Sequence, residues 1–329
     1  MIISKTPYRI SFFGGGTDYP NWYLKNGGEV ISATIDKYIY ISCRQLPNFF
    51  EHSYRIVYSK IENVKNLSQI KHLVVREILK KSKIKHGLEI HYDGDMPARS
   101  GMGSSSSFVV GLINVINSFN KNKFNKLDLA KKSIHLEQKV LKETVGSQDQ
   151  IAAAYGGLNS IKFFKNGKFK VTPLLKNKKE IEKFNKNFFL IFTGINRTAK
   201  FVAKTYVNKL HREKRSDLLK LINQVKIAKK LLIEKKYDKF GLLLNEAWKI
   251  KKNLSSKVSN HKIEKIYKNG IKSGASGGKL LGAGGGGFIL FYVKKKNQRK
   301  FKNKMNKYLN IPFQFSNEGS KIIFEQKDA

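Results

Sequence analysis

The chain has 329 residues and is 40% hydrophobic, which is enough for two domains with a packed core and excludes global disorder. No apolar run approaches the roughly 18 residues that a membrane-spanning helix needs, and the first residues lack the charged-then-apolar plan of a signal peptide. The only cysteine, Cys43, excludes an intrachain disulfide, and no zinc-ligand spacing occurs. We therefore expect a cytoplasmic protein without a membrane segment.

The charge of the chain is strongly positive. Lys and Arg total 64 against 24 Asp and Glu, a formal net charge of +40. Such a charge attracts nucleic acid, anionic membranes or phosphorylated small molecules. The lysines are scattered along the chain and form no single basic block, which is also what a lysine-biased proteome produces. A polyanion-binding or nucleic-acid-binding protein is therefore a less favoured alternative, since no recognition motif accompanies the charge.

Alternating apolar residues predict a strand over residues 8–12, followed by a glycine-rich turn at residues 14–18. Residues 30–41 are also strand-like, and a break at Asp36-Lys37 predicts two paired strands there. The pattern restarts with a strand near residue 187, so we expect two domains, at residues 1–186 and 187–329. Helical spacing occurs at 127–142 and 215–234, and further strands are predicted at 188–192 and 288–293.

The segment at residues 97–107, which reads Pro-Ala-Arg-Ser-Gly-Met-Gly-Ser-Ser-Ser-Ser, is the strongest indication of function. A strand-like stretch with Leu88, Ile90 and Tyr92 on one face precedes it, and the helix-like run 108–116 follows. A loop in this position directs backbone N–H groups and the positive end of a helix dipole at one point, where a phosphate binds. The segment therefore predicts a phosphate-binding loop. It is not a Walker A motif, because no Lys follows the second glycine.

A flexible linker is the alternative for this segment, and its flanking strand and helix disfavour it. A second glycine-rich loop, at residues 282–287, runs directly into the strand predicted at 288–293. Glycine permits positive φ angles and close backbone packing there. This loop alone is weak evidence of function. Together, the two loops predict two walls of one cleft.

One carboxylate lies where apolar residues are expected. In the helix predicted at 127–142, Glu137 belongs to the apolar stripe that Ile134 and Leu141 continue. A buried carboxylate must be paired, hydrogen-bonded or bound to a metal. From the residues alone, a salt bridge to a lysine and a role as a metal ligand are equally open.

A second carboxylate, Asp149, lies in the first turn of a predicted short helix. Ser147 can cap this helix, and Gly156 ends it. Ala152 and Ala153 lie on the same face as Asp149 and leave room for a substrate. The first turn of a helix supports an ionised carboxylate, as a proton acceptor requires. Simple compensation of the helix dipole is the alternative role.

Together these motifs resemble those of the GHMP kinases, a family that includes galactokinase, homoserine kinase, mevalonate kinase and phosphomevalonate kinase. Residues 7–18 are similar to the first family motif and residues 282–287 to the third. The serine-rich loop is similar to the second, with Met102 where the family usually has Leu. The resemblance implies a two-domain α+β kinase with an N-terminal ATP-loop domain and a C-terminal ferredoxin-like domain. It also implies ATP and Mg²⁺ as cofactors.

By motif position, the resemblance implies that Asp149 is the catalytic aspartate and Arg9 the basic residue beside it. It also implies that Ser105 and Glu137 hold Mg²⁺. A catalytically inactive family member that acts as a binding module is a second alternative, which the presence of Asp149 and Glu137 disfavours. The nucleotide phosphates are expected on the loop formed by Gly101, Met102, Gly103, Ser104, Ser105, Ser106 and Ser107.

Within that family, residues 14–18, 28–40 and 148–150 are similar to the D-glycero-D-manno-heptose 7-phosphate kinases. This branch phosphorylates the anomeric hydroxyl, which gives the 1,7-bisphosphate for nucleotide-activated heptose. Galactokinases carry Glu-His where this chain has Gly15-Gly16, which speaks against galactose. Fucokinases share a similar opening, so an L-fucokinase-like enzyme stays an alternative.

The resemblance makes a small sugar phosphate the expected partner, and the sequence leaves a homodimer open. Residues expected to contact the sugar are Gly15, Gly16, Thr17, Asp18, Gly284 and Gly285. A distal phosphate on the sugar is a dianion that cationic side chains bind best. The candidates for holding it are Lys37, Arg99, Arg197 and Lys200.

Overall fold

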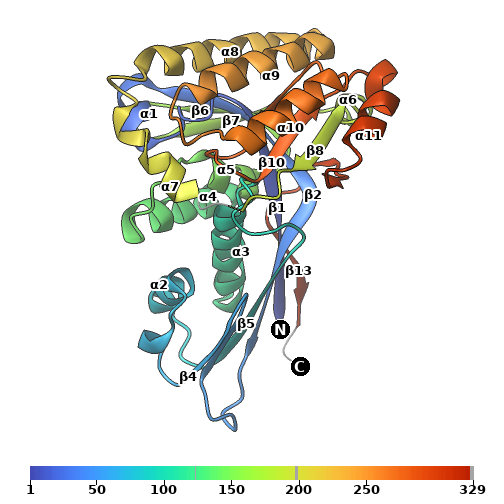
Figure 1. Ribbon diagram of the computed structural model, residues 1–329. Coiled ribbons are helices and arrows are strands. Elements are labelled where there is room, and N and C mark those ends of the chain that lie inside the picture. The colour runs from blue at the N-terminus through green and yellow to red at the C-terminus, as the bar shows by residue number, and fades with distance from the viewer. Residues whose placement is uncertain (123, 197–198, 327–329) are drawn as a thin grey trace.

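The computed structural model describes residues 1–122, 124–196 and 199–326, which form two sheets with helices around them (Figure 1). The strands are β1 (Ile2–Phe13), β2 (Gly28–Gln45), β3 (Tyr54–Val57), β4 (Ile61–Val64), β5 (Leu88–Gly94), β6 (Leu158–Phe163), β7 (Phe169–Pro173), β8 (Phe188–Phe192), β9 (Gly277–Leu280), β10 (Phe288–Tyr292), β11 (Asn310–Ile311), β12 (Phe315–Ser316) and β13 (Lys321–Glu325). The helices are α1 (Pro20–Asn26), α2 (Leu73–Lys81), α3 (Ser104–Phe119), α4 (Lys126–His135), α5 (Gln148–Tyr155), α6 (Lys178–Asn185), α7 (Ala199–Lys204), α8 (Arg215–Ile233), α9 (Tyr237–Lys252), α10 (His261–Lys272) and α11 (Gln298–Met305).

The first sheet is organised around β2, an 18-residue strand that pairs with β1, β5, β6 and β12. The predicted division of this segment into two strands is therefore wrong. Its pairing with β1 changes register at the expected break, since Arg9 pairs with Thr34 while Pro7 pairs with Tyr38. The extra residues of β2, among them Asp36-Lys37, form a bulge, which bends a strand without ending it.

The predicted order of strand, loop and helix around residues 97–107 is confirmed. Strand β5 ends at Gly94, and α3 begins at Ser104 and lies along β1 and β2 (Figure 1). Val109, Leu112 and Val115 of this helix are fully buried against the sheet. Burial of each such side chain contributes about 1.5–3 kcal/mol, which fixes the start of α3 relative to β1.

The second sheet has the order β11-β8-β10-β9, and all its neighbouring strands are antiparallel. Along the chain it reads strand, helices, two strands, helix, strand, which is the ferredoxin-like arrangement expected for the C-terminal part. It begins at Phe188, next to the expected boundary at residue 187. Strands β12 and β13 then return to the first sheet and pair with β2 and β1. The boundary between the two predicted domains at residue 187 stays a prediction.

The two long helical predictions are confirmed. Helix α8 covers nearly the whole of 215–234, and α4 continues from His135 into a turn of π-helix at Leu136–Val140. The π-turn carries Glu137, and such turns are frequent at functional sites. Among the described residues, no helix is both long and apolar enough to cross a bilayer.

Candidate active site

Residues 97–107 form the loop predicted to bind phosphate, called the phosphate loop below. This loop contacts β1 through its backbone and its side chains. Gly101 and Gly103 both have a φ of 79°, a left-handed conformation that favours glycine. Between them, Met102 is fully buried, and its carbonyl accepts a hydrogen bond from the Arg9 amide at 3.0 Å. The Met102 side chain is therefore part of the hydrophobic core, and Met102 contributes to the loop through its backbone.

The loop serines divide into two pairs. Ser106 and Ser107 are buried: the Ser106 hydroxyl donates to Glu137 at 2.8 Å, and the Ser107 hydroxyl donates to the Pro7 carbonyl at 2.9 Å. Ser104 is partly exposed and Ser105 is exposed. No side chain in the described part of the chain caps the start of α3, whose cap residue is Gly103. The first N–H groups of α3 thus lack a capping acceptor and suit an anionic ligand.

The two glycine-rich loops lie against each other, as two walls of one cleft would require. Gly287 packs on the backbone of Ser100. A Cβ on Gly101 would lie 2.8 Å from the Leu281 carbonyl oxygen, and one on Gly282 would lie 2.5 Å from the Gly101 Cα. Glycine is therefore required at these positions for two backbones to touch.

We expect Gly282→Ala to push the phosphate loop away from its position, because the new Cβ overlaps Gly101 and the φ of 68° is strained for alanine. KM for ATP should rise at least ~10-fold, equivalent to about 1.4 kcal/mol. Gly167→Ala is the matched control, since Gly167 has a φ of 81° and a Cβ there would meet only the tip of the Leu24 side chain within 4 Å. It should lower stability by about 1–2 kcal/mol and leave KM for ATP unchanged. Equal KM values in both variants would contradict the role of loop packing.

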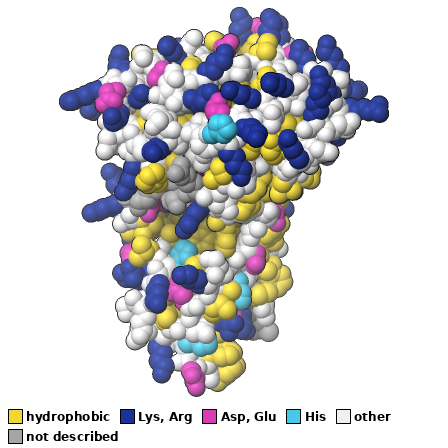
Figure 2. All heavy atoms as spheres, viewed as in Figure 1, with side chains coloured by type: hydrophobic (Ala, Val, Ile, Leu, Met, Phe, Trp, Pro, Cys, Tyr) yellow, Lys and Arg dark blue, Asp and Glu magenta, His cyan; other side chains and the backbone are white. Residues whose placement is uncertain are grey.

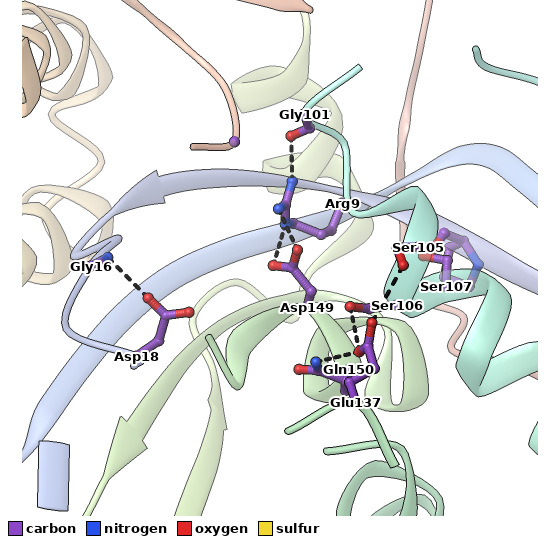
Figure 3. A network of polar contacts seen from close by, with 12 residues as sticks. Arg9, Gly16, Asp18, Gly101, Ser105, Ser106, Ser107, Glu137, Asp149 and Gln150 are labelled. Atoms are coloured by element: carbon purple, nitrogen blue, oxygen red, sulfur yellow. Dashed lines mark hydrogen bonds and ion pairs between the residues drawn. The ribbon is translucent and has the colours of Figure 1, made fainter. Parts of the chain in front are cut away.

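An ion pair between Arg9 and Asp149 lies at the centre of the site (Figure 3). The Arg9 guanidinium donates from Nε and Nη2 to the two carboxylate oxygens of Asp149, at 2.7 and 2.6 Å. Its Nη1 donates to the Gly101 carbonyl at 2.7 Å. This bidentate geometry orients the carboxylate and connects it to the phosphate loop. Asp149 is in the first turn of α5, as predicted, beside buried Ala152 and Ala153.

Glu137 is buried in a cluster of neutral hydrogen-bond donors (Figure 3). It accepts hydrogen bonds from the hydroxyls of Ser106 and Ser105, at 2.8 and 3.4 Å, and from the Gln150 amide at 2.5 Å. It makes no ion pair with any described residue, so the lysine salt bridge is not found there. Burial raises the pKa of Glu137 to about 7, although the hydrogen bonds from Ser106 and Gln150 oppose the shift.

The donor set around Glu137 fits a hard cation. Carboxylate and hydroxyl oxygens are the ligands that Mg²⁺ prefers, and nucleotide-bound Mg²⁺ takes one or two carboxylates plus phosphates. Consistent with so few protein ligands, the described residues contain no cluster of three or more His, Cys, Asp or Glu arranged for a metal. Glu137 and Ser105 could hold such an ion beside the phosphate loop.

The loop after β1 brings Asp18 close to the same centre. The Gly16 amide donates to the Asp18 carboxylate at 2.9 Å, and Asp18 is almost fully buried (Figure 3). Thr17 is buried too and donates to the Gly14 carbonyl, so its side chain closes the turn. Burial and the nearby charge of Asp149 raise the pKa of Asp18 from 3.8 to about 6.

This shift predicts how stability depends on pH. The folded protein keeps the Asp18 proton over a range in which the unfolded chain has released it, so stability falls as pH rises from about 4 through about 6. In Asp18→Asn the part of this loss that comes from Asp18 should disappear, so that at pH values above about 6 the variant gains up to about 3 kcal/mol relative to the parent. The part that comes from the raised pKa of Glu137 should remain. Urea unfolding across pH measures the difference. Asp93→Asn, which replaces an exposed carboxylate and leaves Asp18 intact, should keep the parent's pH dependence and gain no stability relative to the parent.

Sequence reasoning missed two lysines near these loops, of which Lys279 is buried and Lys251 half-buried. Lys251 donates to the carbonyls of Leu280 and Gly282, at 2.7 and 2.5 Å, and thereby holds the second glycine loop. Lys279 donates to the Phe12 carbonyl at 2.7 Å. Burial lowers the pKa of Lys251, and burial and then Arg9 lower the pKa of Lys279 to about 7. The one signal in the sequence concerned Lys279, a charged residue that directly precedes the apolar pair Leu280-Leu281 at the start of the second glycine-rich loop.

Several other predicted residues lie apart from this network. Gly284 and Gly285 are buried against Val258. Lys37 lies near the neighbouring Asp36 carboxylate at 3.8 Å, and Arg99 is exposed with a φ of 61°. Arg197 and the side chain of Lys200 fall outside the described part of the chain.

Ser147 does not cap α5 as predicted. Its φ and ψ are helical and its side chain makes no cap hydrogen bond. Instead, its hydroxyl accepts a hydrogen bond from the Gln138 amide at 3.0 Å and is 3.3 Å from the Tyr23 hydroxyl. The Ser147 side chain therefore connects α5 to the π-turn. The amide oxygen of the next residue, Gln148, is buried without a partner among the described residues.

The GHMP kinases N terminal domain matches residues 68–157, and the GHMP kinases C terminal region matches residues 228–311. The chain is 33% identical to a D-glycero-alpha-D-manno-heptose 7-phosphate kinase of Campylobacter jejuni, over 97% of this chain and 98% of the relative. It is 26% identical to a bifunctional fucokinase/GDP-fucose pyrophosphorylase of Arabidopsis thaliana, over 89% of this chain and 30% of the relative.

The fold is also that of solved kinase structures. The crystal structure of a D-glycero-D-manno-heptose 1-phosphate kinase from Bacteriodes thetaiotaomicron is similar with a TM-score of 0.81. That likeness covers 99% of this chain and 100% of the other at 22% identity, and it concerns the fold alone. The two domain matches and the full-length relative at 33% identity show the family as well as the fold. The chain belongs to the GHMP kinases and is an ATP-dependent sugar kinase.

Proposed function

We propose that this kinase transfers a phosphoryl group from ATP to the anomeric hydroxyl of D-glycero-D-manno-heptose 7-phosphate. The product is the 1,7-bisphosphate, which serves the synthesis of nucleotide-activated heptose. The observation that carries the chemistry is the bidentate pair of Arg9 and Asp149 beside Gly101. The full-length similarity to a heptose 7-phosphate kinase of Campylobacter jejuni supports the choice of sugar.

In this proposal, Asp149 accepts the proton of the anomeric hydroxyl or orients that hydroxyl electrostatically. Arg9 fixes the direction of the carboxylate through its two hydrogen bonds. Together with the amides of the phosphate loop, Arg9 stabilises negative charge on the transferring phosphoryl group. Positioning and electrostatics of this kind supply most of the catalysis in phosphoryl transfer.

The nucleotide phosphates are proposed to lie at the start of α3, where Ser104 is partly exposed and Ser105 is exposed. The hydroxyl of Ser100, at the base of this loop, is buried and has no partner among the described residues. Glu137 and Ser105 would hold Mg²⁺, and the bound ion would neutralise phosphate charge. A cation at this position would offset the cost of burying an ionised Glu137.

The sugar is proposed to lie between Asp18, the Gly15-Gly16 turn and α5. A Cβ on Gly15 would meet only Ser11 and the Gln148 amide within 4 Å, so the turn leaves space for a ligand. Asp18 would bind a ring hydroxyl. The Gln148 side chain has no partner in the described part of the chain and would bind another.

Substrate choice is tested by turnover across a panel of sugars. We expect kcat/KM for heptose 7-phosphate to exceed that for free mannose, fucose or galactose by at least ~100-fold, or about 3 kcal/mol. A clamp on the distal phosphate with charge-assisted hydrogen bonds has about this value. Of the Ala variants of Lys37, Arg99, Arg197 and Lys200, at least one should raise KM for the sugar phosphate and leave KM for ATP unchanged.

An L-fucokinase-like activity is the second candidate, because the Arabidopsis thaliana relative carries a fucokinase part. The same panel separates the two proposals. If free L-fucose is the best substrate and the four Ala variants behave like the parent, the heptose proposal is wrong and the fucokinase proposal replaces it.

A further inference from the structure

A groove of about 1450 Å³ beside the second sheet is lined by many lysines. The sequence showed scattered lysines, but the fold brings them together where α6, the start of α9, the β10–α11 connection and β11 meet. Figure 2 shows Lys and Arg side chains gathered at the upper right, where Figure 1 places α6 and α11. The groove shares no residue with the network of Figure 3. Ten of its lining residues are lysines: Lys179, Lys183, Lys186, Lys235, Lys236, Lys239, Lys294, Lys295, Lys296 and Lys302.

Most of this charge is not compensated within the protein. The lining contains only two acidic residues, Glu182 and Asp238. Among the ten lysines, Lys294 pairs with Asp238, Lys235 with Glu180 and Lys236 with Glu234. The other seven make no ion pair with any described residue, and all are exposed: Lys179, Lys183, Lys186, Lys239, Lys295, Lys296 and Lys302.

The composition of the groove restricts what it can bind. A concave surface fits a chain better than a flat bilayer. All of its cations are lysines, which are point charges without the planar fork that arginine uses for bidentate recognition. Nucleic-acid grooves also present aromatic rings for base stacking. Here the aromatic lining residues are all buried and cannot stack on bases: Phe188, Phe189, Tyr237, Tyr292 and Phe313.

We propose that this groove is a second binding surface of the protein and that it takes a linear chain of phosphates, inorganic polyphosphate. Such a ligand matches many unpaired lysines without needing contacts to bases. Because each phosphate contact releases condensed counterions, the affinity falls steeply with salt. Single-stranded nucleic acid and acidic polypeptides have the same sign of charge and serve as competing probes.

The test is fluorescence-detected binding of labelled polyphosphate to the full chain at several salt concentrations. The groove variant combines Lys183→Ala, Lys186→Ala and Lys296→Ala, which remove three exposed cations. The slope of log affinity against log salt should become shallower by about 2, at about 0.7 per lost contact on a single chain. Kinase turnover should stay at the parent level, since none of these residues belongs to the active site.

A control variant with the same net charge carries Lys165→Ala, Lys168→Ala and Lys170→Ala on the exposed β6–β7 hairpin. It should keep the parent slope and affinity. Equal loss in both variants would overturn the proposal, because it would show attraction by overall charge. Equal or tighter binding of oligothymidylate or polyglutamate of matched charge would also overturn it, since the groove would then not select bare phosphate chains.

Discussion

Asp149→Asn should lower kcat by ~10²–10⁴-fold, the usual contribution of a general base. The substitution keeps the shape of the side chain and removes its charge, so the bidentate pair with Arg9 is lost. Binding of ATP should be nearly unchanged, because the phosphate loop gains or loses no donor. Single-turnover kinetics with heptose 7-phosphate and equilibrium binding of the nucleotide measure the two quantities separately.

Asp128→Asn is the matched control for this experiment. Asp128 lies in the first turn of α4, as Asp149 lies in the first turn of α5. Both substitutions remove a charge that favours a helix start, at a cost of about 0.3–1 kcal/mol. Only the Asp149 variant should lose turnover. Near-parent kcat in Asp149→Asn would remove Asp149 from the catalytic role.

Glu137→Gln should raise the Mg²⁺ concentration needed for half-maximal rate, by ~10-fold or more, as loss of a ligating group does. Gln keeps the shape but replaces a buried carboxylate with a neutral amide, so a cation would no longer find a charge there. Ser105→Ala should have the same effect to a smaller degree, since a hydroxyl is the weaker ligand. Rate measured against free Mg²⁺ at saturating ATP gives the shift.

Glu62→Gln is the control for burial. Glu62 is also buried, and its donors among the described residues are all neutral: the Tyr58 hydroxyl and the backbone amides of Lys71 and His72. Its substitution should reduce stability and leave the Mg²⁺ dependence at the parent value. If Glu137→Gln likewise lowers stability with no change in Mg²⁺ dependence, Glu137 is a structural residue.

Local sequence pattern was sufficient to identify a candidate site residue where that residue differed in chemistry from its neighbours. Glu137 in an apolar stripe and Asp149 among alanines both stand out from their neighbours, and the structure places both beside the phosphate loop. The sequence also showed the two glycine-rich loops, and Gly101 and Gly282 of these loops lie where two backbones touch. These features depend on spacing of a few residues, which a sequence displays directly.

Long-range packing explains what sequence reasoning did not find. The spacing around Lys251 does not distinguish it from the many exposed lysines, and only the fold shows that Lys279 is buried and that Lys251 is half-buried with its ammonium on two carbonyls. The break expected at Asp36-Lys37 is a bulge, because the opposing strand β1 continues past it. Ser147 has the residue type of a cap, but tertiary partners Tyr23 and Gln138 engage its hydroxyl instead.

The return of β12 and β13 to the first sheet has a consequence for biosynthesis. Strand β1, which carries Arg9, has β2 on one side and β13 on the other, and β12 adds to β2. During translation, the free edge of β1 has no partner until residues 321–325 have left the ribosome. Such pairing between distant segments folds slowly and leaves an exposed strand edge meanwhile. The emerging chain is therefore most vulnerable to aggregation late in synthesis, when both sheets exist and the first is still open.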